Sequence, residues 1–419
     1  MSFRQSIALR YPALASRDFT IFWVGQFVSL IGTWMQGTTQ PYLAYRLSGK
    51  PFDLGLIAFI GALPTLIITL PGGVLVERLD KRKTVIAMQA VMMLQAFIMA
   101  ALALSGVIQI WHIAALSFLL GAASAIEITA RQAMLIELVG KKALPNAIAL
   151  QSTIFNAARV IGPSLVAPFL ILIQGNGEGW AFLANGVSYL FIIVSLFFVR
   201  TPFKPEPDAS ERNWRAEFME GQAYIRRTRL LSMIILMATV LGFVGFPLTQ
   251  QIPVIARDVL AQGLNSEAAS AARNSALYTA VGVGALVAAL TLASFDMKRK
   301  GWLLTGGQLI FSVCLVGIAF INSLTMALVL FVLLGWGMVT SLATMNTLIQ
   351  LEVPDNLRGR VFSTYLWGMQ GVAPFGSLMV GWLAQVWGVP GAALVCGLIC
   401  LVFIGGIHLA NPQLRNTVI

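Results

Sequence analysis

Between two long apolar runs, residues 53–77 and 84–106, the chain reads Arg78-Leu-Asp-Lys-Arg-Lys83. Each run is longer than the about 20 residues that a helix needs to cross the hydrocarbon core of a bilayer. The segment between them is short and strongly basic, as expected where a chain turns at the cytoplasmic surface of a membrane. This stretch therefore predicts two transmembrane helices joined by a cytoplasmic loop.

The same alternation continues along the whole chain. Of its 419 residues, 58% are apolar and only 11% are charged, whereas a soluble domain carries about 25% charged residues. The chain therefore lacks the polar side chains that a water-facing surface of its size needs. We expect an all-α membrane protein with twelve transmembrane helices in two six-helix pseudo-repeats. The expected spans are 19–45, 53–77, 84–106, 110–138, 147–173 and 179–200 in the first half, and 230–256, 273–295, 302–321, 324–351, 360–386 and 389–410 in the second.

Positive charge is divided unevenly between the two sides of the predicted membrane. Because Lys and Arg concentrate in cytoplasmic loops, the side with the basic clusters is expected to be the cytoplasm, with both termini there. This distribution also accounts for the net charge of +11 without any nucleic-acid partner. The clusters are those of the N-terminus, residues 78–83, Lys141-Lys142, residues 200–229, Lys298-Arg-Lys300, the segment at Arg358 and the C-terminus.

Two similar segments support the division into halves. Leu135-Ile-Glu-Leu-Val-Gly-Lys-Lys-Ala-Leu144 resembles Leu348-Ile-Gln-Leu-Glu-Val-Pro-Asp-Asn-Leu357, and each follows the fourth expected span of its half. We therefore expect an N-terminal six-helix bundle over residues 1–200 and a C-terminal one over 229–419, related by an axis along the membrane normal.

The linker between the halves, residues 201–228, is the one long polar stretch. Its first part is too rich in proline to form a helix. In its second part Trp214, Phe218 and Ile225 share one helical face opposite charged residues, which indicates an amphipathic helix on the membrane surface. A simple connecting segment would also explain this composition.

The loop after the second expected span resembles a signature of the major facilitator superfamily. The signature has Gly, three residues, an acid, Arg, one residue, Gly and a basic pair, and the chain follows it from Gly73 to Lys83 with Asp80 in place of the second glycine. More narrowly, the chain is similar to the enterobactin-exporter-like, or transmembrane secretion effector, branch. The segments that carry this resemblance are Gly32-Thr-Trp-Met-Gln36 with Gln40, Ala130-Arg-Gln-Ala133, Leu144-Pro-Asn-Ala147, Asn156-Ala-Ala-Arg159-Val-Ile-Gly162-Pro163 and Arg358-Gly-Arg-Val361.

This resemblance implies a secondary active transporter that works by alternating access. Members of the branch generally export siderophores or drugs, and many are taken to exchange substrate for protons. We therefore expect proton-coupled export of amphipathic compounds across the bacterial cytoplasmic (inner) membrane. By the same resemblance, gating residues are expected in the loop and in the antiporter-like segment of the fifth span: Gly73, Glu77, Arg78, Lys81, Arg82, Gly162 and Pro163.

Three charged residues lie well inside expected spans, away from the span ends, where charge is costly and marks a functional candidate. Glu127 lies near the middle of the fourth span and Arg159 near the middle of the fifth, and Arg131 follows Glu127 by one helical turn. These residues are expected to form one buried cluster. In one interpretation, movement of an Arg changes the proton affinity of Glu127 and couples transport to protons. In the other, the cluster is a permanent ion pair that locks the two helices together.

Neutral polar side chains are expected to bind the substrate. In the superfamily, the first and fourth helices of each half surround a central cavity, and here these spans carry amides interleaved with aromatic residues. Amides and rings together suit a bulky amphipathic solute better than a sugar or an inorganic ion. The substrate candidates among them are Gln36, Gln40, Gln250 and Asn346.

The remaining residues indicate no enzyme, metal site or cofactor. Cys314, Cys396 and Cys400 lie in apolar runs and are expected to act as small hydrophobic residues. His112 and His408 are expected at the membrane interfaces, without partners for a metal site or a catalytic dyad. Two alternatives remain: a carrier that flips lipids or lysophospholipids, and a non-transporting membrane receptor or scaffold. The expected partners are a small amphipathic substrate, a proton and membrane lipids, and the expected state is a monomer.

Overall fold

The computed structural model describes residues 11–77, 79–173, 176–203, 214–261, 266–294, 300–354 and 357–411, and the side chains in these ranges except those of 69–77, 214–217, 293–294 and 300. Throughout these ranges the regular structure is helical and no strand occurs. Nine of the described helices are long and apolar enough to cross a membrane. The chain is therefore an all-helical integral membrane protein, as the sequence predicts.

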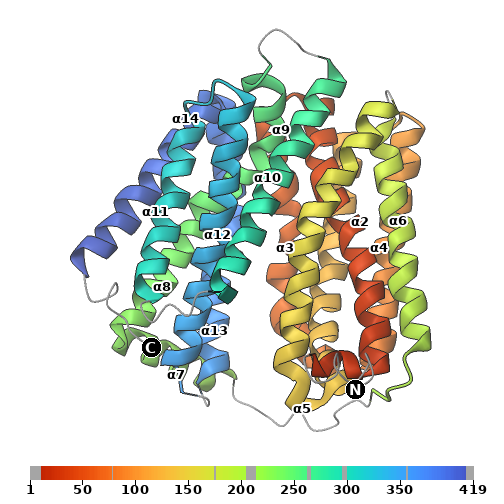
Figure 1. Ribbon diagram of the computed structural model, residues 1–419, viewed down its shortest axis with the longest axis vertical. Helices are drawn as coiled ribbons and strands as arrows, with labels where there is room; N and C mark the ends of the chain where they lie inside the picture. The colour runs from red at the N-terminus through yellow and green to blue at the C-terminus, as the bar shows by residue number, and fades with distance from the viewer. Residues whose placement is uncertain are drawn as a thin grey trace. The chain divides into compact units, whose positions relative to one another are not determined.

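Figure 1 shows the helices in chain order. Their bounds are η1 Pro12–Ala15, α2 Arg17–Ser48, α3 Pro51–Glu77, α4 Lys81–Leu104, α5 Ile110–Leu172, α6 Gly177–Phe198, α7 Trp214–Arg227, α8 Arg229–Val240, η2 Leu241–Gly245, η3 Phe246–Gln251, α9 Ile252–Val254, η4 Ile255–Val259, α10 Glu267–Ser294, α11 Lys300–Ile318, α12 Leu324–Glu352, α13 Arg358–Leu366, η5 Trp367–Gly371 and α14 Ala373–Ala410.

Two of these helices are much longer than one membrane crossing requires. α5 has 63 residues and α14 has 38, against the about 20 of a typical span. Each is interrupted by one glycine with a positive φ of 71°, Gly140 in α5 and Gly388 in α14. Only glycine adopts this conformation without a steric penalty. Each long helix therefore consists of two segments joined at its glycine.

The expected span 230–256 is not one regular helix. After α8 the chain passes through a π-helical turn (η2), a 3-10 turn (η3), the short α9 and a second π-helical turn (η4). Pro247 and Pro253 account for the irregularity, because neither can donate the backbone hydrogen bond of a continuous helix. The turns around them tighten or widen instead.

The chain divides into two compact units. Unit 1 comprises Met1–Leu47 and Ile60–Ser210, and unit 2 comprises Ser48–Phe59 and Glu211–Ile419. In unit 1, α4 packs along both α5 and α6. In unit 2, α12 packs against α10 and α11, and α11 also packs against α14. Each unit thus has a helix core of its own.

A close approach of α2 to the second segment of α5 shapes unit 1. A Cβ atom added to Gly162 would lie 2.6 Å from the Trp34 Cβ and 2.8 Å from the backbone oxygen of Ile31. Helices in lipid associate through close packing of small residues, because lipid tails are as apolar as the side chains. Gly162 thus lets the two backbones meet, and this contact positions two of the helices that build the candidate site.

The linker helix α7 belongs to unit 2 and packs on α13. Glu220 forms an ion pair with Arg360, and Gln222 Nε2 donates a hydrogen bond of 2.8 Å to Thr364 Oγ1. These contacts place one side of α7 against protein.

Two apolar residues of α7 that the sequence places on one face have different surroundings. Ile225 is buried, whereas Phe218 is 52% exposed. The C-terminal end of α7 turns directly into α8, and the Ser232 hydroxyl donates to the Ile225 backbone oxygen. Protein contacts therefore cover Ile225 and leave Phe218 largely exposed.

Candidate functional site

Unit 1 contains a cavity of about 450 Å³ to which α2, α4, α5 and α6 all contribute side chains. Its volume falls within the about 300–1,000 Å³ that is typical of small-molecule sites. The lining mixes apolar, aromatic, amide and charged groups, which suits an amphipathic ligand. The lining residues are Gln26, Ser29, Leu30, Thr33, Gln89, Met92, Leu120, Ser124, Glu127, Ile128, Arg131, Ile148, Gln151, Ser152, Phe155 and Tyr189.

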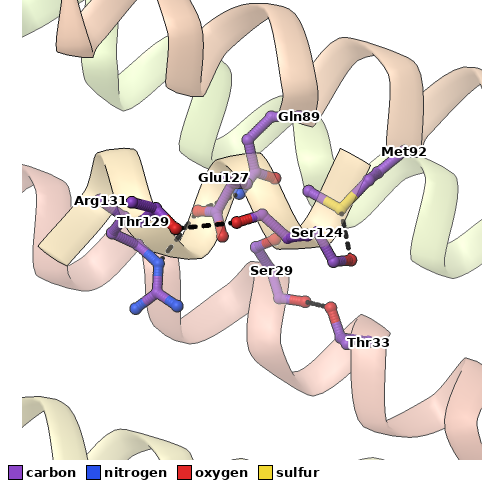
Figure 2. A network of polar contacts seen from close by, with 9 residues as sticks. Ser29, Thr33, Gln89, Met92, Ser124, Glu127, Thr129 and Arg131 are labelled. Atoms are coloured by element: carbon purple, nitrogen blue, oxygen red, sulfur yellow. Dashed lines mark hydrogen bonds and ion pairs between the residues drawn. The ribbon is translucent and has the colours of Figure 1, made fainter. Parts of the chain in front are cut away.

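Glu127 lies in the wall of this cavity and is the centre of its polar network. Glu127 Oε1 accepts hydrogen bonds of 3.0 Å from Gln89 Nε2 and of 3.0 Å from Arg131 Nε. Figure 2 shows the three side chains converging between α4 and α5. The spacing of Glu127 and Arg131, four residues on one helix, brings their side chains together on one face. The sequence predicts this pair, and the structure contains it.

Burial differs between the two charges of the pair. The Glu127 side chain is 6% exposed and that of Arg131 is 22% exposed. Removing the Arg of a buried pair leaves an uncompensated carboxylate, at a cost of about 3–5 kcal/mol. The partial exposure of Arg131 puts this pair towards the lower end of that range.

Arg159 does not join the pair. Its guanidinium carbon lies 4.9 Å from the ring centroid of Trp34 and 5.2 Å from that of Phe155. Among the described residues it forms no ion pair, and its Nε and Nη1 atoms are buried without a hydrogen-bond partner. The expected three-residue cluster is therefore divided, because the second segment of α5 turns Arg159 towards α2 rather than towards Glu127.

Gln36 and Gln40, two of the expected substrate residues, belong instead to a buried network between helices. Asn185 Nδ2 donates to Gln36 Oε1 at 2.6 Å, and Gln36 Nε2 in turn donates to Gln95 Oε1 and Gln40 Oε1, each at 3.2 Å. Gln40 Nε2 completes the network with a bond of 2.8 Å to Ser117 Oγ. The network joins α2, α4, α5 and α6, and neither Gln36 nor Gln40 lines the cavity of unit 1.

The other two substrate candidates lie in unit 2. Gln250 is half-buried in η3. Asn346 is half-buried in α12, where its Oδ1 accepts a hydrogen bond of 2.5 Å from Gln350 Nε2. Neither residue belongs to the cavity described above.

Of the residues expected to gate the cytoplasmic side, the structure describes the side chains of Lys81 and Arg82. Lys81 is buried and forms an ion pair with Glu137 of α5. Arg82 Nη2 donates a hydrogen bond of 3.1 Å to the backbone oxygen of Phe197. Gly73 lies in α3, and the Glu77 side chain and Arg78 lie outside the described part of the chain, so the expected gating roles of these three residues stay predictions.

Asp80, which stands at the second glycine position of the superfamily signature, caps a helix. It is the N-cap of α4, and its Oδ1 accepts a hydrogen bond of 3.0 Å from the backbone N of Lys83. A capped helix start stabilises α4 by about 1 kcal/mol. In the fifth span, Gly162 and Pro163 are both buried at the contact with α2.

His408 is more enclosed than the sequence indicates. The sequence places it near a membrane interface, without partners for a metal site or a catalytic dyad, and its exposed fraction in the structure is 1%. Its Nε2 lies 2.7 Å from Gln308 Oε1 and its Nδ1 lies 3.1 Å from Thr305 Oγ1. Packing of α11 against α14 buries this side chain near the end of α14. His112 caps α5, where its Nδ1 accepts from the backbone N of Gln109.

Sequence reasoning missed Gln89 as a partner of Glu127. The signal was present: Gln89 is an amide inside an apolar run, and such residues mark contacts between helices in membranes. Its direction around α4 cannot be read from one sequence. In the part of the chain that the structure describes, no group of three or more His, Cys, Asp or Glu side chains gathers to hold a metal ion.

Comparison of the whole chain with known proteins identifies its family. The sequence profile of the transmembrane secretion effectors, a family of major facilitator transporters, matches residues 9–418. The chain belongs to this family. Secretion effectors of this kind are membrane transporters and not enzymes, which confirms two predictions from the sequence.

Two relatives with known activities align with this secretion effector over almost the whole length of both chains. It is 24% identical to the multidrug efflux pump Tap of Mycolicibacterium fortuitum over 90% of its own chain and 91% of the relative. It is also 24% identical to the enterobactin exporter EntS of Salmonella typhi, over 96% of its chain and 94% of the relative. The structure of a point mutant of the nucleoside transporter NupG matches its fold with a TM-score of 0.75 at 8% identity, over 94% and 99% of the two chains.

Proposed function

We propose that this chain is a secondary active exporter that moves small amphipathic molecules out of a bacterial cell and takes a proton inward at Glu127. The observation that carries the proposal is one buried carboxylate in the wall of a cavity of ligand size. The names of the relatives, a multidrug efflux pump and an enterobactin exporter, support export as the direction and amphipathic compounds as the class.

The proposed architecture has twelve spans in two six-helix pseudo-repeats. The nine membrane-length helices of the described chain include two regions that are interrupted at Gly140 and Gly388. Dividing each at its glycine gives eleven spans, and α2, with 32 residues, supplies the twelfth. Bundles over 1–200 and 229–419, a linker over 201–228, cytoplasmic termini, an inner-membrane location and a monomeric state complete the proposal.

The proposed coupling uses the ion pair of Glu127 and Arg131. When Glu127 is ionised, Gln89 and Arg131 both donate to the same carboxylate oxygen, which ties α4 to α5. A proton on Glu127 removes the charge that holds these donors and leaves Arg131 as an unpaired cation at the cavity wall. Proton binding thus weakens a contact between two helices and changes the charge of the cavity at the same time. An exchanger needs such a link between its proton site and its substrate site.

Gating is proposed at the cytoplasmic ends of α3 and α4. The buried ion pair of Lys81 with Glu137 supports this role, because it joins the start of α4 to α5 next to the break at Gly140. Gly73, Glu77, Arg78 and Arg82 are proposed to act in the same gate. Gly162 and Pro163 are proposed to set the contact of α5 with α2.

The deciding experiment uses the purified protein in proteoliposomes. Accumulation of three dansyl probes is followed with and without an imposed pH gradient: cationic dansylcadaverine, neutral dansyl-leucinamide and anionic dansyl-leucine. One pH unit supplies about 1.4 kcal/mol per proton, which supports about a tenfold substrate gradient at one-to-one exchange. We expect the wild type to accumulate at least one probe in response to the gradient and Glu127→Gln to lose that response.

Three results would contradict the proposal. Transport that ignores the pH gradient in the wild type would rule out proton exchange, and dependence on lipid headgroup would then favour a carrier that flips lipids. A Glu127→Gln variant that keeps its gradient response would make the ion pair a permanent lock. No transport of any probe would favour a receptor or scaffold. Lys142→Gln serves as the control, since Lys142 is exposed and outside the cavity.

A further inference from the structure

Arg159 lies on the face of α5 that lines the cavity. Ile148, Ser152 and Phe155 are lining residues, and Arg159 follows Phe155 by four positions. Successive spacings of four, three and four residues keep these side chains on one side of an α-helix. Arg159 therefore continues the cavity wall by one more helical turn.

Trp34 extends the opposite wall in the same way. It follows the lining residue Leu30 by four positions on α2. The rings of Trp34 and Phe155 lie 5.5 Å apart and meet edge to face at 70°. Both rings lie about 5 Å from the Arg159 guanidinium, at 4.9 and 5.2 Å. Two aromatic walls from different helices thus hold one cation at the end of the cavity.

The positive charge of Arg159 has no negative partner in the described part of unit 1. Its Nε and Nη1 atoms are shielded from solvent and make no hydrogen bond to a described residue, although the side chain as a whole is only half-buried. Each cation–π contact stabilises a desolvated guanidinium by about 1–2 kcal/mol. A hydrogen-bonded carboxylate would stabilise it more strongly. Glu127, the one carboxylate among the described lining residues, is already bonded to Gln89 and Arg131.

The charge balance of the site is therefore positive. The pair of Glu127 with Arg131 is neutral as a unit, and Arg159 adds one uncompensated positive charge. A guanidinium keeps its proton at any pH that a protein tolerates and offers planar donors that match a carboxylate or phosphate. A half-buried cation whose Nε and Nη1 donors are unused, next to a ligand-sized cavity, favours an anionic ligand.

We propose that Arg159, Trp34 and Phe155 bind the anionic group of an amphipathic substrate whose apolar part occupies the cavity of unit 1. This inference rests on the proposed transport function and names the charge of its substrate: an organic oxyanion, carboxylate or phosphate, in preference to an organic cation. The guanidinium pairs with the oxyanion, and the two rings hold the guanidinium plane and exclude water from the ion pair. The oxyanion belongs either to a free organic acid or to a lipid headgroup.

Equilibrium binding to the purified full-length protein tests this site without any pH gradient. The protein is reconstituted in phosphatidylcholine nanodiscs and titrated with dansyl-leucine, which carries a carboxylate, and with dansyl-leucinamide, its neutral counterpart. A charge-assisted bond to guanidinium is expected to make the acid bind about tenfold more tightly than the amide. Arg159→Gln should remove this preference, and Lys142→Gln, which changes the net charge equally at an exposed position, should keep it.

Trp34→Leu tests the aromatic wall. Removing one ring should weaken binding of the acid about threefold while Arg159 keeps part of the charge preference. Adding phosphatidylglycerol to the nanodiscs then separates the two sources of oxyanion. Displacement of dansyl-leucine from the wild type by this lipid supports a headgroup as the natural ligand, and continued binding supports a free organic acid.

Several outcomes would overturn the proposal. These are equal affinity of the wild type for acid and amide, no binding of the acid, or an equal loss of both ligands in Arg159→Gln, which would assign Arg159 to helix packing. The two proposals fail separately. Loss of gradient response leaves an acid preference measurable at equilibrium, and loss of the acid preference leaves gradient-driven transport of the other probes measurable.

Discussion

Each unit of the molecule buries one titratable side chain against a glutamine of a neighbouring helix. The glutamine is Gln89 of α4 in unit 1 and Gln308 of α11 in unit 2. In unit 1 the glutamine donates its Nε2 to the carboxylate of Glu127. In unit 2 its Oε1 lies 2.7 Å from the imidazole of His408.

The two clusters differ in access. Glu127 and Gln89 line a cavity, and Arg131 is partly exposed there. His408, Gln308 and Thr305 are all buried, and none of them belongs to that cavity. A group that exchanges protons and responds to a substrate must be reachable by both, whereas a sealed, fully bonded group contributes mainly to stability. We therefore propose that the cluster at the cavity of unit 1 serves transport and that the buried cluster of unit 2 serves packing.

The largest expected difference between the two clusters is in transport driven by a pH gradient. Glu127→Gln keeps the shape of the side chain but removes its charge, so accumulation under a pH gradient of one unit should fall about tenfold. His408→Gln should change accumulation less than about twofold. Both are measured with the dansyl probes in proteoliposomes. Equal losses in the two variants would mean that the buried cluster of unit 2 also takes part in coupling.

For protein stability, we expect a substitution in the buried cluster of unit 2 to have a clear effect. His408→Leu removes the partner of Gln308 Oε1, whereas Thr305 Oγ1 keeps its bond to the backbone oxygen of Gly301. One buried group that loses its partner costs about 1–3 kcal/mol, and the free energy of unfolding should fall by that amount. Thermal unfolding of the detergent-purified protein measures the change. The neighbouring Leu409, which is 73% exposed, provides Leu409→Ala as control. Similar melting temperatures for His408→Leu and the control would contradict a stabilising role.

An effect of similar size tests whether the cavity of unit 1 depends on the contact of α2 with α5. In Gly162→Ala the new methyl group meets the backbone of α2, and overpacking of this kind costs about 1–3 kcal/mol. Gly405→Ala, where an added Cβ has no atom within 4 Å, should be nearly neutral. Thermal unfolding and dansyl-leucine affinity should both decline in Gly162→Ala. Unchanged values would show that the helices separate easily at this point.

The smallest effect concerns the end of unit 1 where α2 begins and α6 has ended. Asp18 Oδ2 accepts from the backbone N of Arg200 at 2.9 Å, and from the backbone N and the hydroxyl of Thr201 at 2.8 Å each. Burial alone raises the pKa of Asp18, but the hydrogen bonds from Thr201 and Arg200 and the charge of Arg17 outweigh it and lower the pKa.

Because the pKa of folded Asp18 is depressed, its stabilising contribution is present above the unfolded pKa of about 3.9 and is lost as the pH falls through the folded value. Asp18→Asn should therefore lower stability by about 1 kcal/mol at neutral pH, a value reduced by the partial exposure of the group. The difference from wild type should vanish on acidification, as followed by thermal unfolding. A constant difference down to acid pH would exclude the carboxylate charge as its source.

The sequence by itself determined the elements and their local chemistry. Long apolar runs with basic ends predict membrane helices, because each helix satisfies its own backbone hydrogen bonds in lipid and needs no partner to do so. The pair of Glu127 with Arg131 was also predictable, since both residues lie on one helix at a spacing that the helix itself brings together. The resemblance in the loop at Gly73 and along the later segments indicated the family.

Only the tertiary structure decided which helix faces meet. It directed Arg159 to Trp34 rather than to Glu127, gave Glu127 its second donor from Gln89, and placed His408 against Gln308. The physical reason is that hydropathy shows that a helix lies in the membrane but not how it is rotated there. Rotation and register are set by close packing at contacts such as Gly162 against α2, between residues far apart in the chain.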